Sequence, residues 1–521
     1  MGPVTLFFGL LLPWALGIAA LLTARDARRP LGAPGELAWL AGAGFVGGAL
    51  LLTLWMRALS AVGVPFGIAA IALPLLAATL ALAYAALRRH GGSAPMVAAA
   101  RAALRLPDGI GGVTRILWWT LCAWMALRFA LLGLEIAARP LYPWDAWIAW
   151  ATKARVWYEL GRIAPFVDAG QWLAGTGTAW FDALPEGPAT LPLLQVWACV
   201  ALGRWDDALM NWPWWQVALA LVLMVYGGLR RLGVGALAAL IGAYFAASLP
   251  LANVHVALAG YADLPLAACY AGAVLALLHW LATRTLRDAV IAALLAAACP
   301  LIKATGTIWV VTLLPGIVVA AMPRLGAKVV GAGFGLVLFA LAVLAQTNFV
   351  VAGRSLHLDF APAWAELAES YLITGSWNLL WYGALGAAIL AWRRIQAPPL
   401  LPLATIVAAG MLFVLILFAF PGVRGLVTDP PTVDRATLHL APLLIVFMLL
   451  AFRAFAEHWR AAYPPPAPPE AAEAPAEPAE PAEPAEPVAP AAPAAPAAPA
   501  APATPEAATT PDASAAPRAA D

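Results

Sequence analysis

The stretch Arg139-Pro-Leu-Tyr-Pro-Trp-Asp-Ala-Trp-Ile-Ala-Trp-Ala-Thr-Lys-Ala-Arg155 follows an apolar segment and opens the longest non-hydrophobic interval in the body of the chain, residues 138–190. It is predicted to be helical from Trp144, and the helix dipole favours an acid such as Asp145 at that start. Tryptophan is typical of a membrane–water boundary, where its ring is in apolar surroundings and its N–H finds water. A carboxylate at the mouth of a membrane core is costly unless it has a function. Asp145 is therefore the first candidate site residue.

The composition indicates a polytopic membrane protein. Of the 521 residues, 63% are hydrophobic and only 11% are charged, and 24 are tryptophan. Soluble chains of this size do not have such a composition. The basic residues of the body lie mostly in short loops, where they orient a membrane protein rather than bind nucleic acid. The four cysteines lie in apolar segments without metal-ligand spacing, and we interpret them as small core residues.

The apolar segments predict an all-α fold with about 13 transmembrane helices, within a range of roughly 11–15. The predicted spans are residues 4–22, 37–56, 66–87, 116–136, 211–229, 234–252, 264–283, 288–302, 305–322, 327–350, 376–392, 400–420 and 436–455. A shorter apolar segment, residues 191–203, is predicted to be a re-entrant or interfacial helix. Arginines in alternate loops predict a multi-pass protein of the cytoplasmic membrane, with the 138–190 loop on the outer face.

Three regions are expected along the chain. Residues 1–114 hold the N-terminal spans and a basic cytoplasmic loop, and residues 115–460 hold the transmembrane body with the outer loop. Residues 461–521 are a tail rich in proline, alanine and glutamate. Because this tail has almost nothing to bury, it is predicted to be disordered, and the span count places it in the cytoplasm.

Two groups of polar residues in the outer loop are candidates for chemistry. In the first, Asp145 is followed by Lys153 and Arg155, and at 100° per residue Lys153 would lie on nearly the same helix face as Asp145. The second is Leu184-Pro-Glu-Gly-Pro188, which places Glu186 just before the short apolar helix. Lys153 and Arg155 are equally well explained as interface anchors whose charged ends reach water.

Further polar residues are expected at the same membrane face. Asp263 in Gly260-Tyr-Ala-Asp-Leu-Pro265 begins a span, Asp434-Arg-Ala-Thr-Leu-His439 precedes the last span, and Lys303 follows the 288–302 span. Simpler explanations exist for Asp263 and for the residues of the Asp434–His439 segment. Asp263 is well placed to cap its helix, Arg435 could contact lipid headgroups, and His439 could make a local hydrogen bond.

The absent motifs narrow the class of substrate. The sequence has no Gly-rich phosphate loop, no His-Glu-x-x-His, no Gly-x-Ser-x-Gly and no Asp-x-Asp pair. The sequence therefore contains no recognisable motif for binding a soluble nucleotide donor. Cations that can hold a phosphate, carboxylates that can act as a base and a lipid-facing setting fit a lipid-phosphate substrate instead.

These motifs resemble those of a known family over residues 115–455. Tyr142-Pro-Trp-Asp-Ala-Trp147 followed by Lys153-Ala-Arg155 is similar to the first outer loop of the C-superfamily (GT-C) integral-membrane glycosyltransferases, the group of protein O-mannosyltransferases and the aminoarabinose transferase of lipid A. Gly260-Tyr-Ala-Asp-Leu-Pro265, Lys303-Ala-Thr-Gly306 and Leu438-His-Leu-Ala-Pro442 resemble later landmarks. The chain departs from the pattern at Glu186-Gly187, where Asp-Tyr is usual, and at Ala304-Thr305, where Asn-Glu is expected.

The resemblance implies a transferase that moves a sugar from a polyprenyl phosphate to a glycan, lipid or protein acceptor, with inversion. In that family an aspartate early in the first outer loop is the catalytic carboxylate, which corresponds to Asp145. Glu186 is the second expected catalytic residue and would position the acceptor or the sugar. Expected substrate-binding residues, the cations among them for the departing phosphate, are Lys153, Arg155, Lys303, Arg435, Asp263, His439, Trp144 and Trp147.

Several questions stay open at this level. No cofactor is required by the residues, although the sequence leaves room for a divalent metal. The partners expected are the lipid-linked sugar, its acceptor and the bilayer, with no nucleic acid. The alternatives to an enzyme are a transporter or flippase of lipid-linked saccharides and a catalytically degenerate subunit.

Overall fold

A computed structural model describes residues 2–27, 29–103, 105–175, 180–347, 349–351, 354–356, 358–425 and 432–463. Residues Met1–Tyr463 form one compact unit. The predicted disordered, cytoplasmic tail lies outside the described residues from Pro464 onward.

The described chain is helical apart from one short β-hairpin, in which β1 (Phe349–Val351) pairs antiparallel with β2 (Arg354–Leu356). The helices of the first half are α1 (Pro3–Thr23), α2 (Glu36–Ala61), α3 (Ile68–Arg89), α4 (Ala94–Ala103), α5 (Gly112–Ala138), α6 (Trp144–Ala146), the π-helix η1 (Trp147–Ala151), α7 (Thr152–Leu160), α8 (Ala169–Leu173), α9 (Thr190–Leu202), the 3₁₀-helix η2 (Leu209–Asn211), α10 (Trp212–Arg231), α11 (Ala236–Ser248) and α12 (Pro250–Ala257). Those of the second half are α13 (Asp263–Thr283), α14 (Leu286–Ile302), α15 (Gly306–Val311), α16 (Leu314–Ala321), α17 (Gly326–Gln346), α18 (Trp364–Ala368), the π-helix η3 (Glu369–Ile373), α19 (Leu380–Leu390), α20 (Leu400–Ala419), α21 (Pro421–Gly425), α22 (Val433–Leu438) and α23 (Ala441–Ala462).

The chain is a multi-pass membrane protein, as predicted. Within the described residues, nine helices are long and apolar enough to cross a membrane, and the pair α11 and α12, bent by 55°, raises the number to ten. The prediction of about 13 spans is therefore too high by this criterion. The predicted spans 288–302, 305–322 and 376–392 form shorter helices. In the second of these the helix is interrupted between α15 and α16, just before Pro315, because proline cannot donate to the preceding turn.

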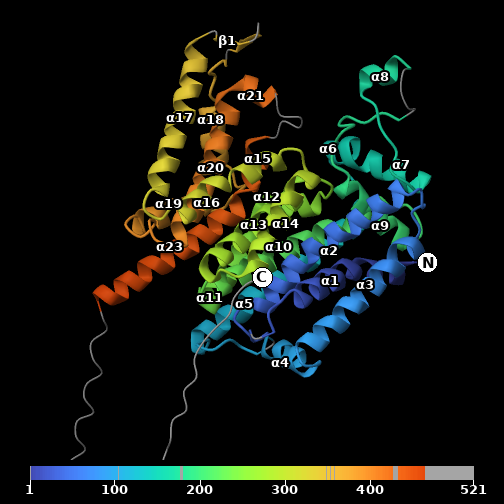
Figure 1. Ribbon diagram of the computed structural model, residues 1–521, viewed down its shortest axis with the longest axis horizontal. Coiled ribbons are helices and arrows are strands. Elements are labelled where there is room, and N and C mark those ends of the chain that lie inside the picture. The colour runs from blue at the N-terminus through green and yellow to red at the C-terminus, as the bar shows by residue number, and fades with distance from the viewer. Residues whose placement is uncertain are drawn as a thin grey trace, which may run out of the picture. The chain divides into compact units, whose positions relative to one another are not determined.

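Burial separates a central helix from lipid-facing ones. In α13, 89% of the apolar window is buried, whereas in α17 the share is 6%. Helix α13 packs against α2, α10, α14, α22 and α23, and α17 lies beside α16 at the edge of the body (Figure 1). Large apolar side chains on α3, α5 and α17 are exposed, which is expected of surfaces in contact with a bilayer.

The short apolar helix α9 is part of the core. Twelve of its 13 residues are buried, and it contacts α1, α2, α7 and α10. The indole Nε1 of Trp197 donates to the carbonyl of Gly9 in α1 at 3.0 Å, and Gln195 Nε2 donates to Asn211 Oδ1 at 3.1 Å. The segment is thus a short helix, as predicted, and neighbouring helices pack around it, while its re-entrant or interfacial position stays a prediction.

Helices α1 and α2 approach closely through small residues. A Cβ atom on Gly17 would overlap the carbonyl oxygen of Gly44, and one on Gly48 would overlap the carbonyl oxygen of Pro13. Glycine at such positions lets two backbones in a membrane come into van der Waals contact, which is a main source of helix association in lipid. The α1–α2–α3 group in Figure 1 depends on this contact.

We expect Gly48→Leu to lower the stability of the detergent-solubilised protein by about 1–3 kcal/mol, because the new side chain forces α1 away from α2. The control is Gly47→Leu, since a Cβ on Gly47 meets no atom within 4 Å. Thermal unfolding followed by size-exclusion chromatography measures both variants. Equal midpoints for the two variants would contradict this account of the α1–α2 contact.

Candidate functional site

The Asp145 segment is helical from Trp144, as predicted, but not as one regular α-helix. The three-residue α6 leads into the π-helix η1, and α7 begins at Thr152. Trp144 and Trp147 are 65% and 43% exposed, and their rings meet edge to face with centroids 5.0 Å apart. The side chain of Asp145 between them is 38% exposed. Asp145 is thus a carboxylate within reach of a ligand, beside two exposed aromatic rings.

Asp263 is the buried centre of the site. It is the first residue of α13 and is fully buried. Lys303 Nζ, just after α14, lies 2.9 Å from Asp263 Oδ1, and Arg435 Nε, in α22, lies 2.9 Å from Oδ2. The helix-cap explanation of Asp263 is therefore wrong, because its two oxygens are engaged by the two cations.

Arg435 joins the buried carboxylate to the exposed one. Its Nη1 donates to Asp145 Oδ2 while its Nε donates to Asp263, and its guanidinium lies 4.7 Å from the centroid of the Tyr261 ring. Thr432 caps α22 by accepting from the backbone N–H of Arg435. Burial raises the pKa of Tyr261 above its usual value, so its hydroxyl stays protonated.

Two histidines complete the surroundings of Asp263. His439 Nε2 lies 3.5 Å from Asp263 Oδ1, and His255 Nε2, on α12, lies 3.8 Å from Oδ2. His439 Nδ1 also pairs with the carbonyl of Ala436 at 3.0 Å, so the predicted local hydrogen bond is present. Burial lowers the pKa of His439 to about 4, and the imidazole is neutral at physiological pH. We call Asp145, Asp263, Lys303, Arg435, His255, His439 and Tyr261 the Asp263 cluster.

Lys153 does not belong to this cluster. Its side chain is 1% exposed, and its Nζ lies 3.0 Å from Asp182 Oδ1 and donates to the carbonyls of Ala149 and Leu184. The expectation that Lys153 shares a helix face with Asp145 assumed a regular α-helix. The π-helix η1 between them has wider turns, so the rotation between the two residues differs from the α-helical one.

The Lys153–Asp182 ion pair holds the loop segment around Asp182 against α7, the helix that contains Lys153. Burial lowers the pKa of Lys153 and raises the pKa of Asp182, and each charge opposes the shift of the other. Leu184 N–H donates to Asp182 Oδ1 at 2.8 Å. The pair therefore positions the loop rather than presenting a cation to a ligand.

Two other predicted residues lie on the surface. Arg155 Nη2 pairs with Glu159 Oε1 at 2.8 Å, and its guanidinium lies 5.0 Å from the centroid of the Trp205 ring. Glu186 is exposed, and among the described residues no ion pair joins it to the Asp263 cluster. The structure thus brings together Asp145, Asp263, Lys303, Arg435 and His439, with Trp144 and Trp147 beside Asp145, but not Lys153, Arg155 or Glu186.

Three residues of these arrangements were missed in the sequence. His255 and Asn253 are polar residues in an otherwise apolar run, and that pattern could have drawn attention to His255. Tyr261 lies inside a motif that we singled out for Asp263. Asp182 follows Trp180 and Phe181, and an acid next to two aromatic residues is a sign of burial.

Comparisons with protein families, with curated proteins and with solved structures find no match to this chain. Among the described residues, no three His, Cys, Asp or Glu side chains are arranged to hold a metal ion. The function is therefore inferred from the Asp263 cluster and its surroundings.

Removing one partner of the Lys153–Asp182 pair should be costly. We expect Asp182→Leu to lower the stability by about 3–5 kcal/mol, because Lys153 is left as a buried unpaired charge. The double variant Lys153→Met/Asp182→Leu should recover most of that loss, since an apolar pair carries no desolvation cost. Thermal unfolding of the single and double variants measures this, and a double variant less stable than Asp182→Leu would contradict it.

Proposed function

We propose that this protein is a membrane glycosyltransferase of the GT-C type, which moves a sugar from a polyprenyl phosphate to an acceptor hydroxyl. The observation that carries the proposal is the Asp263 cluster: an accessible carboxylate, Asp145, is joined by Arg435 to a buried carboxylate and a lysine. In our assignment the cluster lies at the outer face of the cytoplasmic membrane. The acceptor is a glycan, lipid or protein hydroxyl.

The position of Asp145 supports its role as the general base. A base must reach the proton that it removes, and Asp145 is the more exposed of the two carboxylates, at 38% against 0% for Asp263. Asp145 engages Arg435 through Oδ2, and among the described residues no hydrogen bond is made to Oδ1, the oxygen that we propose receives the acceptor proton. Trp144 and Trp147 provide exposed rings on which a sugar or the acceptor can stack.

The proposed reaction is a single displacement. Asp145 takes the proton of the acceptor hydroxyl as the acceptor oxygen attacks the anomeric carbon. The bond between that carbon and the phosphate oxygen breaks, and its electron pair leaves with the polyprenyl phosphate. The configuration at the anomeric carbon is inverted because attack comes from the face opposite the leaving group.

Arg435 links the two halves of this reaction. When Asp145 accepts the proton, its charge is lost, and Arg435 keeps Asp263 as its charged partner in the cluster. At the same moment the leaving phosphate gains a negative charge. The guanidinium, no longer paired with a charged Asp145, can then stabilise the negative charge on the phosphate. Electrostatic stabilisation of charge that develops in the transition state usually contributes most to the rate enhancement. Lys303 holds Asp263 and supplies the second positive charge.

An apolar groove supports a lipid-linked donor. The groove has a volume of about 360 Å³ and lies between α17 and α20, with Phe360 and Trp364 from the connecting segment in its wall. It includes Phe420 at the C-terminal end of α20, and α20 in turn contacts α22, the helix of Arg435. In our proposal the polyprenyl chain lies in this groove and its phosphate is directed toward Arg435.

The broken span α11–α12 favours a second candidate, a transporter or flippase of lipid-linked saccharides. Its 55° bend places His255 beside Asp263, and interrupted helices at buried charges are common in transporters. Such proteins usually have a matching interruption in each half. In the described residues α11–α12 is the one pair bent by more than 40°, and the break between α15 and α16 lies in a shorter apolar segment. The accessible carboxylate Asp145, held by Arg435, is the observation that favours the enzyme.

We expect Asp145→Asn to reduce sugar transfer by about 10²–10⁴-fold, because the amide cannot accept the proton. Purified protein is incubated with several radiolabelled polyprenyl-phosphate sugars, and release of the free carrier lipid is followed. Asp168→Asn is the matched control, since Asp168 is an exposed aspartate of the same loop that caps α8. Unchanged release by Asp145→Asn would remove Asp145 from the mechanism, and lipid binding without release from any donor would favour the transporter.

We also expect Arg435→Lys to slow transfer by about 10²-fold, the usual effect of losing a donor that stabilises developing charge. A lysine ammonium cannot span Asp145 and Asp263 as the planar guanidinium does. Arg155→Lys should transfer at the native rate, because Arg155 lies on the surface with Glu159. Equal effects of the two substitutions would contradict the proposed role of Arg435.

A further inference from the structure

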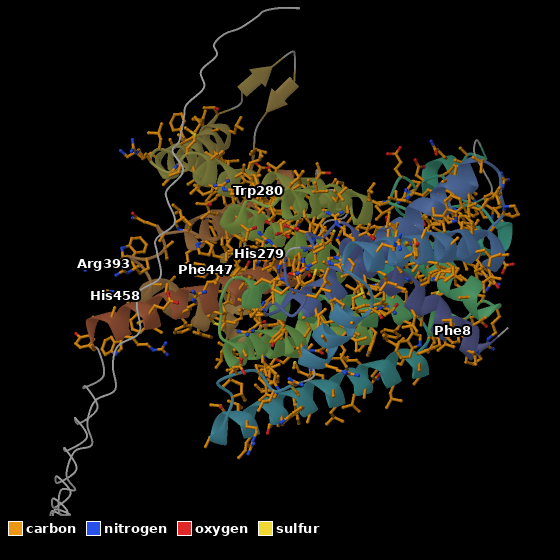
Figure 2. All side chains as sticks on the ribbon, turned by 60° about the horizontal axis from the view of Figure 1, so that its bottom comes forward. Phe8, His279, Trp280, Arg393, Phe447 and His458 are labelled. Carbon is orange, nitrogen blue, oxygen red and sulfur yellow. The ribbon has the colours of Figure 1, made fainter. Side chains whose placement is uncertain are left out.

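A second group of buried charges lies at the other end of α13. We call it the arginine cluster and define it as Arg25, Glu36, Arg231, His279, Arg287 and Asp288. These residues lie just after α1, at the start of α2, at the end of α10, in the last turns of α13 and at the start of α14. His279 lies inside the body, in the view of Figure 2 near Trp280. The cluster is one length of α13 away from Asp263, about 30 Å for 21 residues.

The carboxylates of this cluster are fully engaged. Glu36 Oε1 lies 3.0 Å from Arg25 Nε and 2.9 Å from Arg287 Nη1, and Glu36 Oε2 lies 3.1 Å from Arg231 Nε. Asp288 accepts from Arg231 Nη2 at 2.9 Å and from Thr285 at 2.7 Å. The remaining donors of Arg25 bind the carbonyls of Arg29 and Pro30.

The charges of the cluster do not balance. Three arginines face two carboxylates, which leaves one positive charge. The side chains of Arg25, Arg231, Glu36 and Asp288 are each between 2% and 7% exposed, and that of Arg287 is 13% exposed. A buried charge without a counter-charge is expensive, so an additional negative charge would lower the energy of this arrangement.

The cluster also holds donors without acceptors. In the described part of the chain, Arg231 Nη1, Arg287 Nε and Arg287 Nη2 are buried and have no hydrogen-bond partner, and the same holds for Trp39 Nε1 beside the cluster. The two ring nitrogens of His279 also lack partners, and in a neutral imidazole one of them is a donor and the other an acceptor. The guanidinium of Arg231 lies 5.0 Å from the centroid of the Trp39 ring, so these donors come from neighbouring side chains. Arginine and tryptophan can only donate, and the partner that they lack is an acceptor.

We propose that the arginine cluster binds one small inorganic anion, a chloride or a phosphate, held by the unpartnered donors of Arg231 and Arg287. An anion supplies the missing negative charge and the missing acceptor together. Arg231 and Arg287 each form an ion pair with one oxygen of the Glu36 carboxylate. Both guanidinium groups are therefore held in position without the anion. The bound ion would tie α2, α10 and α14 to the end of α13. The proposal does not depend on the transferase activity.

The first test is direct binding to the native protein. Detergent-purified chain is equilibrated with radioactive chloride, and the thermal unfolding midpoint is measured as gluconate is replaced by chloride or by phosphate at constant ionic strength. We expect one chloride per chain and a midpoint that rises saturably with either small anion. No bound chloride together with a midpoint indifferent to both anions would overturn the proposal.

A matched pair of variants locates the ion. Arg287→Gln removes the excess positive charge and the unpartnered Nε and Nη2 donors, so bound chloride and the rise of the midpoint should both be lost. Arg284→Gln removes an exposed arginine of the same turn and should leave both unchanged. If Arg287→Gln does not fold, Arg287→Lys keeps the charge with fewer donors and should bind chloride more weakly. Equal behaviour of the Arg284 and Arg287 variants would refute the site.

A third experiment tests whether a lipid phosphate headgroup, rather than a small inorganic anion, occupies the arginine cluster. The unfolding midpoint is compared in nanodiscs of phosphatidylcholine with and without phosphatidylglycerol, in gluconate buffer. We expect no dependence on the anionic lipid, because the unpartnered donor atoms are buried. Stabilisation by phosphatidylglycerol with none from chloride or phosphate would show that a headgroup occupies the cluster and would overturn the small-ion proposal.

Discussion

Burial of the Asp263 carboxylate is the constraint on which the site depends. A carboxylate with no access to water must be compensated by nearby cations, and α13, the most buried span, offers no room for side chains to reach water. The compensation comes from Lys303 and Arg435, 40 and 172 residues away in sequence. The requirement therefore fixes the end of α14 and the position of α22 against the start of α13. Through Arg435 it also fixes Asp145, so an exposed residue of the outer loop owes its position to a buried one.

The sequence indicated which charged residues come together in the fold better than it predicted their partners. Polar residues at the ends of apolar segments are conspicuous, and four of those we selected, Asp145, Lys303, Arg435 and His439, lie in the cluster around Asp263. Their pairing could not be predicted, because Asp263 as a helix cap and Asp263 as the acceptor of Arg435 have the same sequence. Lys153 shows the opposite error: its spacing from Asp145 indicated a shared face, but a single π-turn changed the rotation. Glu186 stands where the family pattern has an Asp-Tyr pair, and a position in a sequence motif carries no information about its distance from Asp263.

For the fold, too, the sequence predicted the elements better than it predicted what they pack against. Apolar length identified the spans that are continuous helices, since 18 or more apolar residues have few other stable environments. It identified residues 191–203 as a short helix, but it overestimated residues 305–322 and 376–392, which form shorter helices, and residues 288–302, whose helix has 17 residues. Hydropathy measures how apolar a segment is, but it does not distinguish contact with lipid from contact with neighbouring helices. In α9 the distinction is decided by α1, α2, α7 and α10, which lie at other places in the chain.

The two ends of α13 meet the same physical problem in different ways. Among the described residues at Asp263, two carboxylates and two cations lie together, and Asp145, one of the carboxylates, is partly exposed. At the arginine cluster, in the same described part of the chain, the carboxylates are enclosed and an arginine is in excess. A cluster with an exposed acid can change its charge when that acid takes up a proton, which suits a reaction in which negative charge develops nearby. An unbalanced, enclosed cluster has no titratable acid facing solvent, and its excess can only be met by an ion that stays bound. The first arrangement is thus suited to turnover and the second to holding the helices in place around it.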